Sequence, residues 1–350
     1  MAIVNGGPGD DSLFGTREDD ELHGLGGDDT LRGRRGSDLL DGGAGADRML
    51  GRFGNDTYFV DHAGDRVGER FGEGTDTVIA TLAFRLSKEV ENLELHGRAR
   101  RGTGNNLDNS IVARNSEAED NILNGRGGAD FMSGDLGSDT YYVDDLGDDI
   151  QERGFDAGDR VYSSVTFDLG GDRNPNPNNE GYLEDLILTG SATIDGTGND
   201  RANLIVGNDA DNVLKGFAGA DELDGGGGDD SLYGGDLNVD TLTGGAGSDG
   251  FFFEHITLAF GFRDFIVDFA PEDDTMFLDR ATYTEIAAGP LDADAFAVGT
   301  SAEDAEDRII YDPDTGNVGY DPDGTGSEEA VIFVTVTAGT DLSHLDLIGI

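Results

Sequence analysis

The stretch that decides the fold is a run of six nine-residue units between Gly6 and Phe59, with no gap between one unit and the next. Its units read GGPGDDSLF, GTREDDELH, GLGGDDTLR, GRRGSDLLD, GGAGADRML and GRFGNDTYF. Each unit begins with glycine, carries aspartate at its sixth place and has an apolar or aromatic residue at its eighth. A fixed period of this kind is typical of a solenoid, in which every repeat adds a layer to one continuous core.

The same frame recurs twice farther along the chain. A shorter block occupies residues 102–142, and a longer one occupies residues 198–253, where one unit holds an extra residue, Asn238 or Val239. Together with residues 1–60, these blocks are predicted to form three β-rolls. The sixth places of the two later blocks are Asn121, Asp130 and Asp139 in the shorter one, and Asn203, Asn212, Asp221, Asp230, Asp240 and Asp249 in the longer one.

A second duplication lies between the blocks. The motif GNDTYFVD that begins at Gly54 returns as GSDTYYVD at Gly137, and similar segments follow each copy. These segments, 61–101 and 143–197, alternate apolar and polar residues, which predicts half-buried strands in β-rich spacer units. Residues 254–350 contain no nonapeptides and are predicted to form a β-rich C-terminal cap. The expected fold class is therefore all-β, with parallel β-roll blocks joined by spacers.

The composition limits the partners of this chain. Its 350 residues include 57 glycines and carry a formal net charge of -50. Such a charge repels nucleic acids and anionic membrane surfaces, and it would strain a compact fold by self-repulsion unless cations neutralise it. The chain has no cysteine, so thiolate metal sites are excluded and compartment cannot be judged from disulfide chemistry. Metal cations that prefer oxygen ligands are the partners that this composition favours.

The spacing within a unit predicts a metal-binding loop followed by a short strand. Glycines at the first and fourth places are expected to adopt positive φ angles and to bring carbonyl oxygens together. The sixth-place carboxylate then points into the loop, and the eighth-place side chain points into the core. Because two units should make one coil, carboxylates 18 residues apart are expected to stack. The predicted edges hold Asp11, Asp29 and Asp47 on one side, and Asp20, Asp38 and Asp56 on the other.

Two carboxylates and several backbone carbonyls between successive loops would supply about six oxygen ligands with flexible geometry, which suits Ca²⁺ better than Mg²⁺. Several calcium ions are therefore expected. Zinc is disfavoured because the chain lacks clusters of nitrogen and sulfur ligands. The predicted calcium-binding residues are Gly7, Gly9, Asp11, Asp20, Gly27, Asp29, Gly36, Asp38, Gly43, Gly45, Asp47, Gly54, Asp56, Asn121, Gly128, Asp130, Gly137, Asp139, Asn203, Asn212, Gly219, Asp221, Gly226, Gly228, Asp230, Asp240, Gly245, Gly247 and Asp249.

Some units depart from the pattern. Glu18 replaces the fourth-place glycine, and Arg34 and Arg35 bring positive charge into a loop. Weaker or empty sites are expected there and at the three units with asparagine in the sixth place. Ordering a nine-residue unit costs more conformational entropy than one buried leucine returns, so the rolls are expected to be largely unfolded without cations.

Other groups receive simpler interpretations. Acidic residues outside the frame, such as Asp144, Asp145, Asp148 and Asp149, are expected to be solvated. The aromatic residues at block ends are expected to plug the narrow core. These are Tyr58, Tyr141, Phe251, Phe252 and Phe253.

The nonapeptides and the intervening GNDTY-type motifs resemble the RTX (repeats-in-toxin) family of haemolysin-type calcium-binding repeat proteins over nearly the whole chain. The C-terminal region is similar to that of serralysin-type members in the segments DFIVDF from Asp264, RIIYD from Arg308, YDPDGTG from Tyr320 and LDLIGI from Leu345. This resemblance implies an uncleaved C-terminal signal read by a type I secretion channel, export as an unfolded chain, and folding in external calcium. The start of the chain lacks the basic and apolar stretches of a Sec-type leader, and no run of 18 apolar residues could span a bilayer.

No catalytic domain is expected. The sequence contains no His-Glu-x-x-His motif, no Gly-x-Ser-x-Gly motif and no phosphate-binding loop ending in Gly-Lys-Ser/Thr. The main hypothesis is a secreted calcium-binding protein, outside the cell or at its surface, with a structural or adhesive role. Two alternatives stay open: an extracellular enzyme that acts on a polymer through paired carboxylates, and the secretion module of a larger toxin or hydrolase. The sequence leaves the oligomeric state open.

Overall fold

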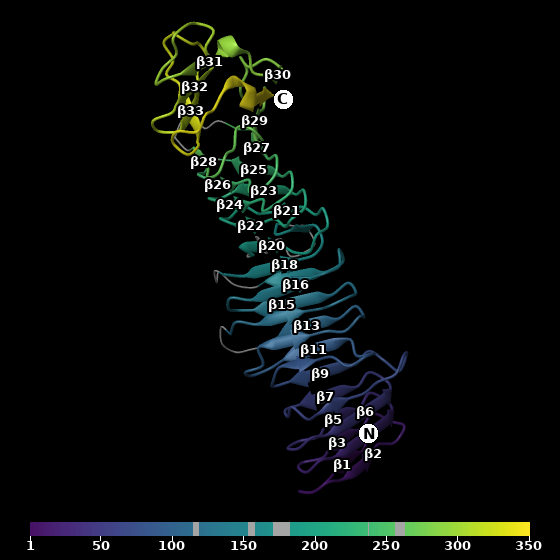
Figure 1. Cartoon of the computed structure of the whole chain (residues 1–350). Helices are drawn as coiled ribbons and strands as arrows, with labels where there is room; N and C mark the ends of the chain where they lie inside the picture. Colours follow the sequence, from purple (N-terminus) through teal and green to yellow (C-terminus); the bar gives the residue numbers. More distant parts are fainter. Residues whose placement is uncertain (115–118, 153–157, 171–182, 237, 256–262) are drawn as a thin grey trace. The chain divides into compact units, whose positions relative to one another are not determined.

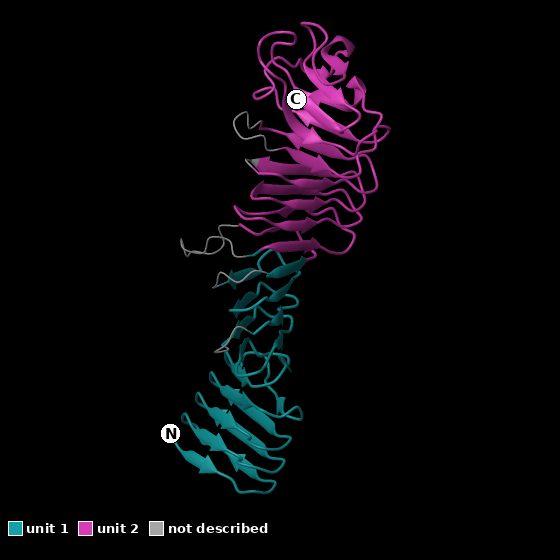
Figure 2. Cartoon of the chain, turned by 90° about the vertical axis from the view of Figure 1, so that its left-hand side faces the viewer, with its two compact units in different colours: residues 1–162, 172–183 teal, residues 163–171, 184–350 magenta. Residues whose placement is uncertain are grey.

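The computed structural model describes residues 1–114, 119–152, 158–170, 183–236, 238–255 and 263–350 (Figure 1). The chain divides into unit 1, residues 1–162 with 172–183, and unit 2, residues 163–171 with 184–350 (Figure 2). Within the described ranges, the regular structure is β apart from two short 3-10 helices, η1 (Ala293–Ala295) and η2 (His344–Asp346). The all-β prediction is confirmed. No helix in these ranges is long and apolar enough to cross a membrane.

Unit 1 is a parallel β-solenoid, because consecutive strands alternate between opposite sheets as the chain coils. One sheet has the order β1-β3-β5-β7-β9-β11-β13-β15-β17. Its strands are β1 (Ile3–Asn5), β3 (Glu21–His23), β5 (Leu39–Asp41), β7 (Thr57–Val60), β9 (Thr77–Ala80), β11 (Asn92–Leu95), β13 (Ser110–Ala113), β15 (Phe131–Asp135) and β17 (Asp149–Glu152).

The facing strands of unit 1 form two shorter runs. The first has the order β2-β4-β6-β8, with β2 (Ser12–Phe14), β4 (Thr30–Arg35), β6 (Arg48–Phe53) and β8 (Arg66–Val67). The second has the order β10-β12-β14-β16-β18, with β10 (Phe84–Arg85), β12 (Arg101–Thr103), β14 (Ile122–Asn124), β16 (Thr140–Val143) and β18 (Arg160–Ser163).

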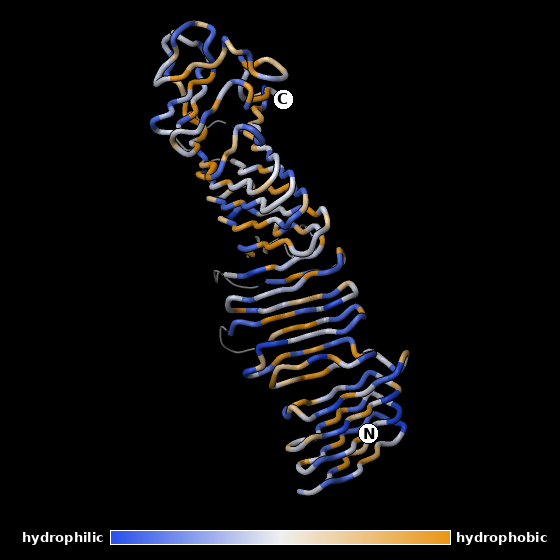
Figure 3. Tube along the Cα trace, in the orientation of Figure 1, coloured by the Kyte–Doolittle hydropathy of each residue, from blue (hydrophilic) through white to orange (hydrophobic). Residues whose placement is uncertain are grey.

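The register follows the predicted period. Leu22 of β3 pairs with Leu40 of β5, and Leu31 of β4 pairs with Met49 of β6, so two nonapeptides make one coil. Each of these strands is short, and its central side chain points inward because alternate residues face opposite sides of a strand. The eighth-place residues therefore stack into the core, where Leu22, Leu31, Leu40 and Met49 are fully buried. Figure 3 shows apolar residues recurring along the strands of each coil.

The spacer strands continue the same sheet. Tyr58 of β7 pairs with Val78 of β9, and Val78 pairs with Leu93 of β11, all in parallel. The predicted spacer strands are thus present, and they add coils of unequal length to the solenoid. The block boundaries drawn from the sequence stay predictions, because β1 to β17 run through them as one sheet.

Unit 2 is also a parallel solenoid and carries antiparallel strands at its C-terminal end. One sheet contains β19 (Phe167–Asp168), β21 (Gly196–Thr197), β23 (Val213–Ala218), β25 (Ser231–Asp236), β27 (Gly250–Phe253), β29 (Thr275–Leu278), β35 (Leu347–Gly349) and β30 (Gly289–Pro290). The facing strands are β20 (Asp185–Leu188), β22 (Leu204–Val206), β24 (Glu222–Asp224), β26 (Thr241–Thr243), β28 (Asp264–Ile266), β34 (Val331–Thr335), β33 (Asn317–Tyr320), β32 (Ile309–Asp312) and β31 (Phe296–Val298).

The C-terminal region is rich in β-structure, as the sequence predicts. Its strands extend the sheets of the roll, since β35 pairs in parallel with β29 and β34 with β28. The prediction that Phe251, Phe252 and Phe253 fill the core is only partly confirmed. Phe251 and Phe253 are buried, whereas Phe252 points to the opposite face of β27, where it stacks between Tyr233 and Phe277.

Candidate metal centres

The sixth-place aspartates form two hydrogen-bonded ladders in the first block. On one edge, the backbone N–H of Asp11 donates to Oδ1 of Asp29 at 2.6 Å, and that of Asp29 donates to Oδ1 of Asp47 at 2.7 Å. The loops therefore stack every 18 residues, and the predicted edges are confirmed. The other edge repeats the contact, at 2.8 and 2.7 Å, through Asp20, Asp38 and Asp56.

The second oxygen of most ladder carboxylates is buried and has no hydrogen-bond partner. A buried carboxylate oxygen that has lost water without gaining a donor carries a large desolvation penalty, which a bound cation removes. Oxygen atoms of this kind are the ligands that Ca²⁺ prefers. The unpartnered oxygens are Oδ2 of Asp29, Asp38, Asp47, Asp56, Asp76, Asp130, Asp139, Asp221, Asp230 and Asp249.

Backbone carbonyls converge on the same points. A Cβ atom on the first-place Gly24 would clash with both Oδ2 of Asp29 and the carbonyl oxygen of Gly42, one coil farther along. Gly216 stands in the same relation to Asp221 and to the carbonyl oxygen of Gly234. Each such loop thus directs a carboxylate and a carbonyl oxygen into one small space, as a hard cation requires.

This close approach corrects one prediction about the glycines. Except for Gly9, the fourth-place glycines do adopt positive φ angles, for example 104° at Gly27 and 102° at Gly36. The first-place glycines do not, and the prediction for them is wrong. They are glycine because the oxygens leave no room for a Cβ atom. The second left-handed residue is instead the second-place one, such as Gly43 with φ 79° or Leu25 with φ 75°.

Burial raises the pKa of many ladder carboxyls, Asp38 among them, and neighbouring carboxylates add to the effect. The pKa of Asp56 rises to about 7 through burial, despite the hydrogen bond from Asp38, and Asp38 and Asp76 raise it further. The pKa of Asp47 rises to about 6 for the same reasons. Without cations, the ladders therefore hold negative charge at neutral pH only at a cost in folding free energy.

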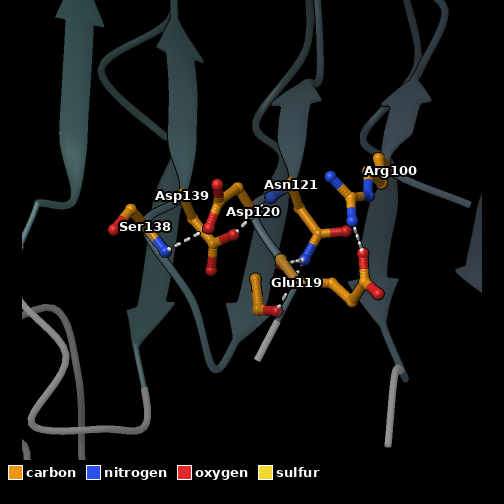
Figure 4. Close-up of polar contacts among 7 residues, drawn as sticks. Arg100, Glu119, Asp120, Asn121, Ser138 and Asp139 are labelled. Carbon is orange, nitrogen blue, oxygen red and sulfur yellow. Dashed lines mark hydrogen bonds and ion pairs between the residues drawn. The ribbon is translucent and has the colours of Figure 1, made fainter. Parts of the chain in front are cut away.

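Asparagine at the sixth place is uncharged, so it avoids the folding free energy that a buried negative charge costs. In the central block, Nδ2 of Asn121 donates to the carbonyl oxygens of Glu119 at 2.6 Å and Gly134 at 3.2 Å (Figure 4). Gly134 is a first-place glycine, and its carbonyl corresponds to that of Gly42 in the first block. The amide group thus occupies the place of a cation, which supports the expectation of weak or empty sites at these units.

The same loop makes further contacts with neighbouring coils. Oδ1 of Asp120 accepts a hydrogen bond from the backbone N–H of Ser138 at 3.1 Å, and Glu119 forms an ion pair with Arg100 (Figure 4). Neighbouring coils are therefore joined beside the ladder as well as through it.

The ladders continue beyond the nonapeptides, through residues that the sequence interpretation missed. Asp148 was expected to be solvated, but it is 3 % exposed and accepts a hydrogen bond from the backbone N–H of Asp130. Asp144 and Asp145 are exposed, as expected. A local signal exists, because each missed aspartate is followed two places later by an apolar core residue. The added rungs are Asp65, Asp76, Asp148, Asp159, Asp264 and Asp274.

Three buried carboxylates gather at the end of the central block. Oxygen atoms of Asp139, Glu152 and Asp159 lie within 4.8 Å of one another. The hydroxyl of Tyr141 donates to Glu152 and accepts from the backbone N–H of Gly134 at 2.8 Å. Oδ2 of Asp139 has no hydrogen-bond donor and is therefore available to a cation. A cation there could contact three carboxylates, whereas a rung of the nonapeptide frame offers two.

The earlier copy of the duplicated segment repeats these interactions. The hydroxyl of Tyr58 donates to Glu69 and accepts from the backbone N–H of Gly51, while Asp56 donates its N–H to Asp76. Both tyrosines are fully buried, so their prediction as core residues is confirmed. The hydroxyl of each tyrosine also positions a glutamate. In both copies the glutamate follows the tyrosine by 11 residues, and this shared spacing is the sequence signal that could have identified the glutamates.

Comparison with known proteins agrees with this geometry. The sequence model of the RTX calcium-binding nonapeptide repeat matches four segments, residues 5–40, 23–58, 115–142 and 197–232. None of the curated proteins searched matches the chain. The matched segments contain rungs of the carboxylate ladders in both units. The chain therefore contains RTX calcium-binding nonapeptide repeats in these four segments.

Proposed function

We propose that this protein binds several calcium ions along the carboxylate ladders and folds as it binds them outside the cell. The observation that carries the proposal is the row of buried carboxylate oxygens without hydrogen-bond partners. Cations would remove both their desolvation penalty and their mutual repulsion. The RTX calcium-binding repeats of the chain support the same function.

The first block illustrates the ligands. Asp29 and Asp47 lie on successive rungs of one edge, and the carbonyl oxygen of Gly42 approaches Oδ2 of Asp29. A calcium ion bound there would be held by carboxylate and carbonyl oxygens from two coils. Since those coils come together only in the folded solenoid, binding free energy becomes folding free energy.

The two tyrosine-linked clusters are proposed as additional ligand sets. Asp139, Glu152 and Asp159 form one, with ligand oxygens within 4.8 Å of one another. Asp56, Glu69 and Asp76, which make the corresponding hydrogen bonds, form the other. Three carboxylates would give each ion a higher ligand charge than a rung of two, so these sites should bind calcium more tightly.

Export and biological role are inferred more indirectly. The similarity of the C-terminal segments to serralysin-type proteins supports type I secretion, and calcium-dependent folding would let the chain cross a channel unfolded. A structural or adhesive role, without catalysis, follows from the absence of the catalytic motifs named above. Expression beside a type I exporter tests the route: the chain should appear in the medium, and removal of residues 254–350 should retain it inside.

Circular dichroism of the chelated protein, titrated with calcium and separately with magnesium, tests the function. A coil spectrum that becomes β cooperatively with calcium, and not with magnesium, is the expected result. A fully β spectrum before any metal is added, or an equal response to magnesium, would contradict calcium-driven folding.

A further inference from the structure

An arginine-rich pocket lies on unit 1, beside the loops that lead to the ladder aspartates Asp20, Asp38 and Asp56; one of its lining residues, Thr16, donates a hydrogen bond to Asp20. Its volume is about 830 Å³, and it lies over the sheet β2-β4-β6-β8. Small-molecule sites in proteins commonly have volumes of several hundred Å³, so the pocket is large enough for a ligand of that kind. Five of its lining residues are the arginines Arg17, Arg32, Arg34, Arg35 and Arg52.

These cations have almost no acidic partners, although the chain carries a net charge of -50. Within the part of the chain that the structure describes, none of the five forms an ion pair, and Glu18 is the one acidic residue that lines the pocket. Arg34 uses Nη1 to donate to the carbonyl oxygen of Gly15 at 3.0 Å. The remaining guanidinium donors are therefore available to an anion from outside the chain.

The placement of two of these arginines opposes folding. Arg34 and Arg52 are direct neighbours in the register of β4 and β6, where like charges repel each other. Both have left-handed backbone angles, with φ 89° and 84°. Leu25 shows that the repeat tolerates such an angle at its second place, but Gly43 at the same place adopts it without strain. The second place adopts this angle with other residues too, such as Arg126 and Phe217, so the specific cost of Arg34 and Arg52 is the repulsion between their neighbouring charges.

The surrounding aromatic rings hold the guanidinium groups in place. Cζ of Arg32 and Cζ of Arg34 each lie 5.3 Å from the ring centroid of Phe14. Cζ of Arg35 lies 5.7 Å from the ring centroid of Phe53. Contact with a ring face orients a guanidinium and leaves its N–H edge free to bind two oxygens of a tetrahedral oxyanion.

We propose that this pocket binds a small molecule that carries a sulfate or phosphate ester. Planar guanidinium forks match the oxygens of both esters, which share this recognition chemistry. A long polyanion is disfavoured, because the acidic remainder of the chain would repel it. The pocket thus gives the protein a site for a small oxyanionic ligand in addition to its calcium ladders.

Isothermal titration of the calcium-saturated protein at low ionic strength tests the proposal. The probes are a sulfated disaccharide and a sugar monophosphate, with the unsubstituted disaccharide as the uncharged control. Saturable binding of either charged probe is expected, and the tighter one identifies the ester. Failure of both charged probes to bind, or equal binding of the uncharged control, would overturn the proposal.

The double variant R34G/R52G separates binding from folding. Glycine accepts the left-handed angle and removes the repulsion, so the melting temperature should stay the same or rise, while affinity should fall about a hundredfold. R85A/R98A, which removes two exposed arginines outside the pocket, should retain its affinity. Unchanged affinity in R34G/R52G, or an equal loss in R85A/R98A, would show that the arginines form no specific site.

Discussion

At the scale of single residues, the sixth place of each repeat determines the charge and the hydrogen bonding of a rung. Aspartate leaves one buried oxygen without a donor, whereas Asn121 places its amide N–H against the carbonyl of the next coil. The two residues have nearly the same shape, so the difference lies in charge and hydrogen bonding. Substitution between them is therefore a direct test of the metal sites.

Replacing Asp29 with asparagine should make the first block less dependent on calcium. The new amide can donate to the carbonyl of Gly42 as Asn121 does to that of Gly134, so the chelated protein should gain about 1–3 kcal/mol in unfolding free energy. The calcium-saturated protein should lose stability, because one ligand charge is gone. Urea titrations with and without chelator measure both changes.

Asp10→Asn is the matched control for Asp29→Asn, since Asp10 is exposed and accepts a backbone hydrogen bond from Asp28 outside the ladder. It should leave both titrations nearly unchanged. Equal destabilisation by Asp29→Asn with and without calcium would argue against a cation at that rung.

The first-place glycine is required by space rather than by backbone conformation. Gly24→Ala would push a methyl group into the point where Asp29 Oδ2 and the Gly42 carbonyl converge, and it should cost about 1–3 kcal/mol in the calcium-saturated protein. Gly26→Ala should cost little, because its nearest neighbour, the carbonyl oxygen of Ala44, would lie 3.6 Å away. Thermal unfolding in calcium compares them, and equal effects would contradict the proposed crowding.

At the scale of elements, the two duplicated segments combine core packing with ligand positioning. Tyr141 lies in β16 and Glu152 ends β17, which belong to facing sheets. Their hydrogen bond crosses the core and holds the glutamate beside Asp139. Tyr58 and Glu69 form the same hydrogen bond in the earlier copy, so the arrangement is a property of the duplicated segment.

Tyrosine-sensitised terbium luminescence tests these clusters, because Tb³⁺ replaces Ca²⁺ at oxygen sites and the chain contains no tryptophan. Emission excited through tyrosine should be strong in the wild type and largely lost in Y58F/Y141F, since each hydroxyl contacts a proposed ligand. Tyr142→Phe is the control: Tyr142 lies next to Tyr141 but points outward. Retention of the signal in Y58F/Y141F would exclude ions at the clusters.

At the scale of the whole molecule, charge governs stability. The chain carries a net charge of -50, and burial raises the pKa of many of its ladder carboxyls, for example to about 7 at Asp130 and Asp230. Groups whose pKa is higher in the folded state than in the unfolded chain bind protons on folding. Their contribution to stability is therefore present at low pH and is lost as pH rises through the folded-state pKa.

The chelated protein should accordingly become less stable as pH rises from about 5 to about 8. Calcium binding should show the opposite dependence, because protons compete for the same oxygens: more calcium should be needed to fold the protein at the lower pH. Circular dichroism melts at several pH values, with chelator and with calcium, measure both trends. A chelated protein that gains stability across this range would contradict the raised pKa of the ladder carboxyls.

Much of this architecture can be predicted from the sequence. The nine-residue period predicts the coil, the inward side chains and the 18-residue stacking of aspartates, because short parallel strands repeat at fixed spacing. The rungs at Asp65, Asp148 and Asp274 also follow a local rule, an aspartate two places before a core residue. A search limited to the strict nonapeptide misses them, since the connecting loops differ in length.

Three features depended on the tertiary structure. The link from Tyr141 to Glu152, the crowding at Gly24 and the pairing of Arg34 with Arg52 all join residues on different coils. A repeat pattern predicts which side chains point inward, but it does not predict which atoms of neighbouring coils are in contact. The repeat pattern is enough to predict the solenoid and its ladders, because strands that recur at a fixed spacing can stack in one register. Only the folded coils decided where carboxylates, tyrosines and arginines converge, because those distances depend on the packing between coils.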